Sequence, residues 1–137
     1  MARLPDIDDE AEAAACDAFA AARRQRLLRS DAAVAETLRL VAIAESVSVD
    51  DLLLSHRGMA DIAFARQLAM YLVHVMLGRT LTQVGTAFGR DRTTVAHACE
   101  LIEDMRDDRA FDEQVSRLES AILAGPSVVQ EAARAAS

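Results

Sequence analysis

Apolar residues recur along this chain at the spacing of helices, and short polar or glycine-containing breaks separate the apolar stretches. Positions three and four apart share one helical face, so this period predicts amphipathic helices. The expected helices cover residues 8–29, 32–45, 60–77, 81–88, 92–105 and 110–123, with one further turn at 52–54. We expect no strands. The pattern therefore predicts an all-α fold, a small helical bundle.

The residues between these stretches are those that begin and end helices. Asp31, Thr80 and Asp91 stand directly before a helix, where a short polar side chain accepts hydrogen bonds from the first backbone N–H groups. Asp50 and Asp51 are expected to cap the turn at 52–54 in the same way. Glycine tolerates positive φ and suits loops and helix ends. The glycines expected there are Gly58, Gly78, Gly89 and Gly125.

Two of the helices differ strongly in character. The stretch at 60–77 is apolar on nearly every face, which is typical of the central helix of a bundle. The stretch at 8–29 is acidic at its start and basic at its end, an order that matches the helix dipole. Its apolar content is thin, so we expect it to pack loosely. Four arginines near its end are expected to form a solvated helix end, with phosphate contact as the alternative: Arg23, Arg24, Arg26 and Arg29.

The composition fits one small domain, or one domain with tails. The chain has 137 residues, of which 52% are hydrophobic and 4% aromatic. This length buries a core without disulfides or structural metals. All 15 basic residues are arginine. The lack of lysine excludes a phosphate-binding P-loop and lysine Schiff-base chemistry.

The cysteines and histidines give no sign of a metal or a cofactor. Cys16 and Cys99 are far apart and match no ligand spacing, so we expect buried free thiols in a reducing compartment. His56 and His74 are too isolated to form a zinc site. No apolar run approaches the length of a membrane span. The N-terminus turns acidic at once, unlike a secretory signal. We therefore expect a cytoplasmic protein with no membrane partner, no cofactor and no bound nucleotide.

Two predicted helices have the proportions of a helix-turn-helix. Residues 81–88 and 92–105 are joined by a tight turn at residues 89–90. The positions of the second helix that share its core side are Val95, Ala98, Cys99 and Ile102. The opposite side and its N-terminal flank carry polar residues, namely Arg92, Thr93, Thr94, His97 and Glu100.

This polar side suits the reading of base edges in duplex DNA. A recognition helix places its N-terminal residues in the major groove. There arginine pairs with guanine, aspartate accepts a hydrogen bond from cytosine, and the threonine methyl group contacts thymine. Residues 91–94, with the sequence Asp-Arg-Thr-Thr, supply these three side-chain types at a helix start.

The distribution of charge matters because the whole chain is acidic, with a net charge of −7. Residues 56–99 hold five arginines and two aspartates, which makes this window +3 and leaves −10 for the rest. Contact with phosphates depends on a local basic patch rather than on net charge. The positive charge of this window therefore favours binding to nucleic acid. The acidic flanks should lower the non-specific affinity for DNA.

Residues 89–99, Gly-Arg-Asp-Arg-Thr-Thr-Val-Ala-His-Ala-Cys, closely resemble the signature of a known family. This is the C-terminal DNA-binding domain of the bacterial replication initiator DnaA, whose pattern is Gly-Arg-Asp-His-Thr-Thr-Val, one residue, then His-Ala. Residues 65–72 look like the central helix of the same family, and residues 81–88 lie at the expected spacing between the two blocks. The resemblance covers about residues 34–105.

The resemblance implies a helical domain that binds double-stranded DNA without catalysis. The residues implied to read bases are Asp91, Arg92, Thr93, Thr94 and His97, with Arg92 where the family usually has histidine. Those implied to contact the sugar–phosphate backbone are Arg57, Arg66, Arg79, Leu81, Thr82 and Arg90, with Thr82 in place of a common proline. For Arg66, a structural ion pair is the alternative. His74 lies near the backbone contacts of the family.

Three departures from the family alter this expectation. The loop that enters the minor groove in the family is here residues 55–60, with the single arginine Arg57, which puts that contact in doubt. Glu100 stands where the family usually has a basic residue, and would repel phosphate or accept from a cytosine. A Gly-rich phosphate loop and the ATPase domain are not found in this sequence.

The sequence thus favours a sequence-specific DNA-binding protein that regulates transcription, or assists or competes in replication initiation. We expect an acidic N-terminal helix at 1–30, the DNA-binding unit at 31–106, and an amphipathic helix with a tail at 107–137. The alternative is a protein-interaction module of the replication or transcription machinery, which binds a partner through its acidic terminal helices and has a weakened DNA face. An enzyme is the least favoured class, because we find no nucleophile–base pair.

Overall fold

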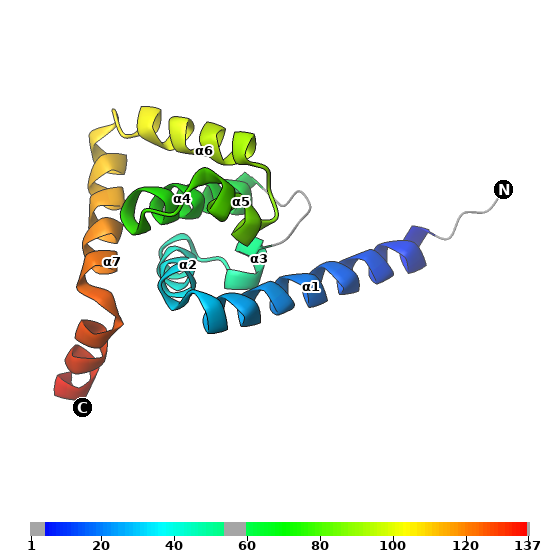
Figure 1. The fold of residues 1–137 in the computed structure, drawn as a ribbon, viewed down its shortest axis with the longest axis horizontal. Helices are drawn as coiled ribbons and strands as arrows, with labels where there is room; N and C mark the ends of the chain where they lie inside the picture. The colour runs from blue at the N-terminus through cyan, green and yellow to red at the C-terminus, as the bar shows by residue number, and fades with distance from the viewer. Residues whose placement is uncertain (1–4, 54–59, 137) are drawn as a thin grey trace.

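The computed structural model describes the backbone of residues 5–53 and 60–136 and the side chains of residues 18–53 and 60–125. Within these ranges the chain forms helices and no strands, as the hydrophobic period predicted (Figure 1). The helices are α1 (Pro5–Ser30), α2 (Ala32–Glu45), α3 (Val49–Leu53), α4 (Ala60–Leu77), α5 (Leu81–Phe88), α6 (Arg92–Met105) and α7 (Arg109–Ala136).

The predicted capping residues define several of these boundaries. Asp31 accepts a hydrogen bond from the Val34 backbone N–H at 3.3 Å and begins α2, and Gly78 follows α4 with φ 67°. The expected cap of α3 was wrong. Ser48 precedes that helix, and its Oγ accepts from the N–H of Asp51 at 3.0 Å. Asp50 and Asp51 lie inside the first turn, where their charge suits the positive end of the helix dipole.

The core forms around α4, the helix that is apolar on most faces. Leu68, Ala69, Leu72 and Val73 have no exposed surface, and α4 packs against α2 on one side and α6 on the other (Figure 1). Each helix contributes at least one residue to this one buried cluster. By length and composition α4 could also cross a membrane, which sequence analysis overlooked. Its burial in the core accounts for its apolar character in this fold.

α1 is fixed to the rest of the molecule more firmly than its thin apolar content suggested. Ala20 and Leu27 are buried in the core. The Nη1 group of Arg23 donates to the carbonyl oxygens of Leu53 and Phe88, each at 3.2 Å. Arg24 forms an ion pair with Asp50 at 3.2 Å. The expectation that all four arginines of this helix end are solvated was therefore wrong for these two.

α7 is held at its N-terminal end by the guanidinium of Arg106. This group contacts Asp112 at 2.6 Å and both carboxylate oxygens of Glu119 at 3.1 Å. It also donates to the hydroxyl of Tyr71 on α4, at 3.1 Å. Hydrogen bonds to Glu119 and then to Asp112 raise the pKa of Arg106 above its ordinary value. A cluster of charged side chains around Arg106 thus joins α6 and α7 to the buried residue Tyr71.

The first part of α7 ends at Gly125, the residue that was predicted to end this helix. Gly125 has φ 75° and ψ 168°, which are non-helical angles, so it interrupts α7. Before it, Val115 and Leu118 are buried against the core, as the apolar stripe of residues 110–123 indicated. After it, the backbone continues as helix to Ala136, where sequence analysis expected a short tail or a frayed helix.

Replacement of Arg106 by alanine should destabilise the protein by about 2–4 kcal/mol, because it leaves half-buried carboxylates without their cation. Urea unfolding followed by circular dichroism measures this change. Arg109→Ala is the matched control, since the pair that Arg109 makes with Glu113 is exposed and should contribute less than about 0.5 kcal/mol. Equal losses of stability in the two variants would contradict a special role of the Arg106 cluster.

Candidate nucleic-acid interface

α5 and α6 form a helix-turn-helix whose connection is defined by hydrogen bonds. At the start of α5, the Thr80 hydroxyl accepts from the Gln83 N–H at 3.0 Å, and the Gln83 side chain accepts from the Thr80 N–H at 2.9 Å. This reciprocal capping box satisfies two otherwise unpaired donors. α5 ends at Gly89, which has a left-handed conformation with φ 67°. The predicted cap and turn are therefore confirmed.

The turn also depends on a glycine that sequence analysis did not single out. Gly85 is buried in the middle of α5, and its carbonyl accepts from the N–H of Arg90 at 2.9 Å. A Cβ atom at Gly85 would lie 2.5 Å from the Arg90 carbonyl oxygen. The absence of a side chain thus lets the turn lie directly on α5. A glycine inside an eight-residue helix, where it costs about 1 kcal/mol relative to alanine, was the available signal.

α6 begins at the capping residue Asp91, whose Oδ1 accepts from the Thr94 N–H at 2.8 Å. This hydrogen bond lowers the pKa of the Asp91 carboxyl. Hydrogen bonds from the Thr94 hydroxyl and the Thr93 backbone N–H lower this pKa further, so the carboxyl is ionised at neutral pH. An acceptor at this place is the group that a base amine such as cytosine N4 requires.

The two faces of α6 separate as its periodicity predicted. Val95, Ala98 and Ile102 are buried, and Cys99 is half-buried. The residues predicted to read bases are all exposed and gather at the N-terminal end of the helix: Asp91, Arg92, Thr93, Thr94 and His97. The structure thus places this whole set on one accessible surface, beside the turn.

The residues predicted to contact the DNA backbone are placed less uniformly. Thr82 is exposed and Leu81 half-buried at the start of α5, and Arg90 lies half-buried in the turn. Of these three, Arg90 directly precedes the predicted base-reading residues, and the other two lie at the opposite end of α5. Arg57 falls outside the described residues.

Arg66 and Arg79 are engaged in internal contacts instead. Arg66 is only 5% exposed, and its guanidinium donates to the carbonyl oxygens of Leu52 and Asp51, each at 3.2 Å. Arg79 forms a two-pronged ion pair with Asp31 at 2.8 and 2.9 Å, which lowers the pKa of that carboxyl. Their placement gives no support to the phosphate contacts expected of them, because both guanidinium groups tie neighbouring helices together.

His74 lies at the same connection between α4 and α5 as Arg79. Its Nδ1 lies 2.7 Å from the carbonyl oxygen of Arg79. The imidazole therefore supports the connection between α4 and α5, rather than lying at the surface of the base-reading set.

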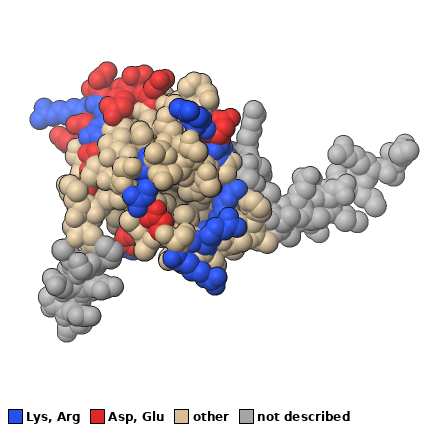
Figure 2. Space-filling model, viewed as in Figure 1, with Lys and Arg blue, Asp and Glu red and all other residues tan. Residues whose placement is uncertain are grey.

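The charge of α6 changes sign along its length. Beyond the predicted base-reading residues, the exposed acidic residues of α6 are Glu100, Glu103 and Asp104, and Asp107 and Asp108 follow directly after the helix. Figure 2 shows acidic side chains gathered over α6 near its junction with α7, and basic ones over α1. Phosphates are repelled from the C-terminal half of α6, so a nucleic acid can approach only its N-terminal half.

The arrangement of a capped support helix, a glycine turn and an exposed polar second helix defines the class: a helix-turn-helix protein. Residues 34–102 match the family model described as the bacterial dnaA protein helix-turn-helix. The chain therefore belongs to this family, as its motif indicated, and membership supports binding to double-stranded DNA. The family is not one of enzymes.

Comparison with individual proteins agrees with this assignment. The chain is 40% identical over 79 residues to the chromosomal replication initiator protein DnaA 1 of Protochlamydia amoebophila. The matched segment covers 58% of this chain and 17% of that protein. It is 47% identical over 73 residues to the chromosomal replication initiator protein DnaA of Brucella abortus. This match covers 53% of the present chain and 14% of the Brucella protein. The chain thus spans less than a fifth of the length of these relatives.

Gly85→Ala should destabilise the fold by about 1–3 kcal/mol, because the new methyl group meets a backbone carbonyl that cannot move without opening the turn. Thermal unfolding measures the loss. Thr86→Ala, the adjacent exposed position on the same helix, is the control and should leave stability nearly unchanged. If Gly85→Ala were as stable as the control, close packing of the turn would not be required.

Proposed function

We propose that this protein binds duplex DNA sequence-specifically, with the N-terminal end of α6 in the major groove. The observation that carries this proposal is the gathering of five exposed polar side chains at the capped start of α6, on a turn that close packing holds in place. The set combines acceptors, an arginine and threonine methyl groups, which together distinguish base pairs at the edges of the major groove. The residues proposed to read bases are Asp91, Arg92, Thr93, Thr94 and His97.

The backbone of the DNA would be held by groups around this set. Leu81 and Thr82 lie at the first turn of α5, the element that contacts phosphates in helix-turn-helix proteins. Arg90 in the turn completes the proposed backbone contacts, together with Arg57, which lies outside the described residues. We propose residues 31–106 as the DNA-binding unit.

The biological role that fits these features is occupancy of short sites like those of the initiator DnaA. The protein would then regulate transcription, or assist or compete with the initiator, in the cytoplasm and without catalysis or a nucleotide. The family-model match supports the choice of site, because it covers residues 34–102, which include most of α6.

A protein-interaction module remains the second candidate, and the acidic half of α6 is the observation that favours it. Three exposed carboxylates there, with Asp107 and Asp108 directly after the helix, would repel DNA and would suit a basic partner surface. The two candidates differ in whether the start of α6 discriminates between DNA sequences.

Fluorescence anisotropy on a labelled duplex with an initiator box, against a scrambled duplex of equal composition, tests the proposal. Both measurements use about 150 mM salt, because phosphate contacts make the affinity depend on salt. We expect tighter binding to the box. Equal weak binding would place specificity elsewhere, and no binding would favour the protein-interaction module.

Thr93→Ala should weaken binding to the box by about 1–3 kcal/mol and leave binding to the scrambled duplex nearly unchanged, since the lost methyl and hydroxyl contacts are with bases. The same anisotropy titration measures both. Ser120→Ala, an exposed change of similar size on α7, is the control and should affect neither. An equal loss on both duplexes would exclude base reading by Thr93.

A further inference from the structure

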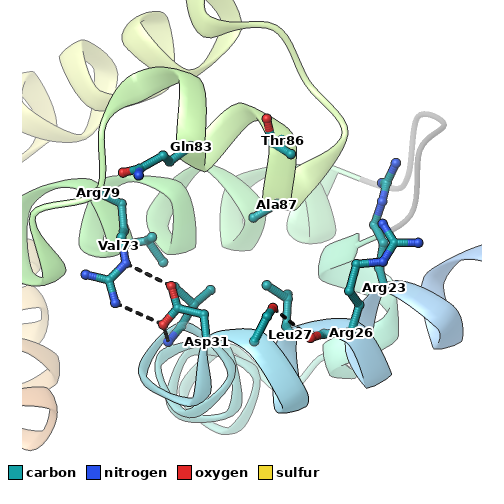
Figure 3. Close-up of a pocket in the computed structure, with 11 residues that line it drawn as sticks. Arg23, Arg26, Leu27, Asp31, Val73, Arg79, Gln83, Thr86 and Ala87 are labelled. Atoms are coloured by element: carbon teal, nitrogen blue, oxygen red, sulfur yellow. Dashed lines mark hydrogen bonds and ion pairs between the residues drawn. The ribbon is translucent and has the colours of Figure 1, made fainter.

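A groove separates α1 from α5 beside the helix-turn-helix (Figure 3). Its volume is about 270 Å³, and it runs from the C-terminal half of α1, across the start of α2, to the exposed side of α5. Its polar lining comes from two segments distant in sequence, residues 23–31 and 79–86, and consists of Arg23, Arg26, Ser30, Asp31, Arg79, Gln83 and Thr86. Sequence analysis gave this groove no role.

The charges in the groove do not balance. Asp31 neutralises Arg79 through their two-pronged ion pair. Arg23 donates only to carbonyl oxygens, and within residues 18–53 and 60–125 the guanidinium of Arg26 makes no hydrogen bond or ion pair. The groove therefore carries two positive charges without a carboxylate, in a protein whose net charge is −7.

The arginines also repel one another. Burial, and then the charges of Arg90 and Arg26, lower the pKa of Arg23. Keeping these cations close together costs free energy in the absence of an anion. An anionic ligand would relieve that cost, and an arginine fork matches the oxygens of a phosphate.

The position of the groove indicates which anion it meets. The guanidinium of Arg23 lies against the last residue of α5 and against Gly89 of the turn, so the groove adjoins the connection to α6. Gln83 on α5 is exposed, and its carboxamide oxygen is engaged in the capping box, which leaves its NH₂ group free to donate. Figure 2 shows the basic side chains of α1 on the same face as α5.

We propose that the groove between α1 and α5 is a second phosphate-contact surface, which holds the backbone of duplex DNA flanking the site read by α6. Arg26 is the main contact, with Arg23 on the same helix and the amide of Gln83 across the groove on α5 (Figure 3). This inference rests on the proposed function. It makes α1 an active part of the DNA-binding unit, whereas the predicted unit began at residue 31.

The test compares two labelled duplexes, the initiator box alone and the same box with several base pairs added on both sides. The wild-type protein should bind the longer duplex more tightly. Arg26→Ala should lose about fivefold in affinity for the longer duplex at about 0.15 M salt, and its plot of log K against log salt should be shallower by about 0.9, the value for one phosphate contact. Its preference for box over scrambled sequence should be unchanged.

Arg117→Ala is the matched control, because it removes the same charge from an exposed position on α7, a helix that does not line the groove. Equal behaviour of the two variants would overturn the proposal and show only the effect of net charge. A wild-type protein that binds box and scrambled duplexes equally would overturn sequence reading, yet the comparison of the two variants would still decide the role of the groove. Failure of the wild type to bind any duplex would overturn both.

Discussion

The close approach of the Arg90 carbonyl to Gly85 is the contact on which the placement of α6 and its exposed polar residues depends. It lets the turn lie on α5 with no side chain between them, and so it sets the angle at which α6 leaves the turn. Phe88, whose side chain is buried in the core, offers its carbonyl to Arg23, which joins α1 to the same turn. The exposed residues at the start of α6 therefore stand on a connection braced from two sides, and a recognition surface gains precision from such rigid support.

Arginine serves two purposes in this chain, and composition alone does not distinguish them. Arg66 and Arg23 donate to carbonyl oxygens at helix ends, and Arg106 binds carboxylates at the α6–α7 corner. The planar guanidinium satisfies several acceptors at once, which suits the free carbonyls that helices leave at their C-terminal ends. A window with a positive formal charge thus presents less positive charge to solvent than its count of arginines suggests, since part of that charge is used to join helices.

The parts of this fold that sequence analysis predicted are those that local interactions decide. Thr80 and Asp91 cap their helices through hydrogen bonds to residues three positions on, and the apolar period of α4 needs no knowledge of its partners. The partners of Arg66 and Arg79 could not be predicted, because they lie 15 and 48 positions away and are brought close only by the packed helices. Within the site, the exposed side of α6 followed from its periodicity, whereas Gly85 and the groove beside α1 depend on how separate helices meet.

The change of sign along α6 has a kinetic consequence. A protein with a basic flank and an acidic far end carries a dipole, and the field of a duplex turns such a molecule so that its basic flank faces the phosphates before contact. The net charge of −7 meanwhile weakens non-specific binding, so the protein dissociates quickly from DNA that offers no base contacts. A search made under these two influences would consist of brief, correctly oriented encounters, with little sliding along the duplex. The acidic residues at the α6–α7 junction would in this way shorten the time spent on DNA that offers no base contacts.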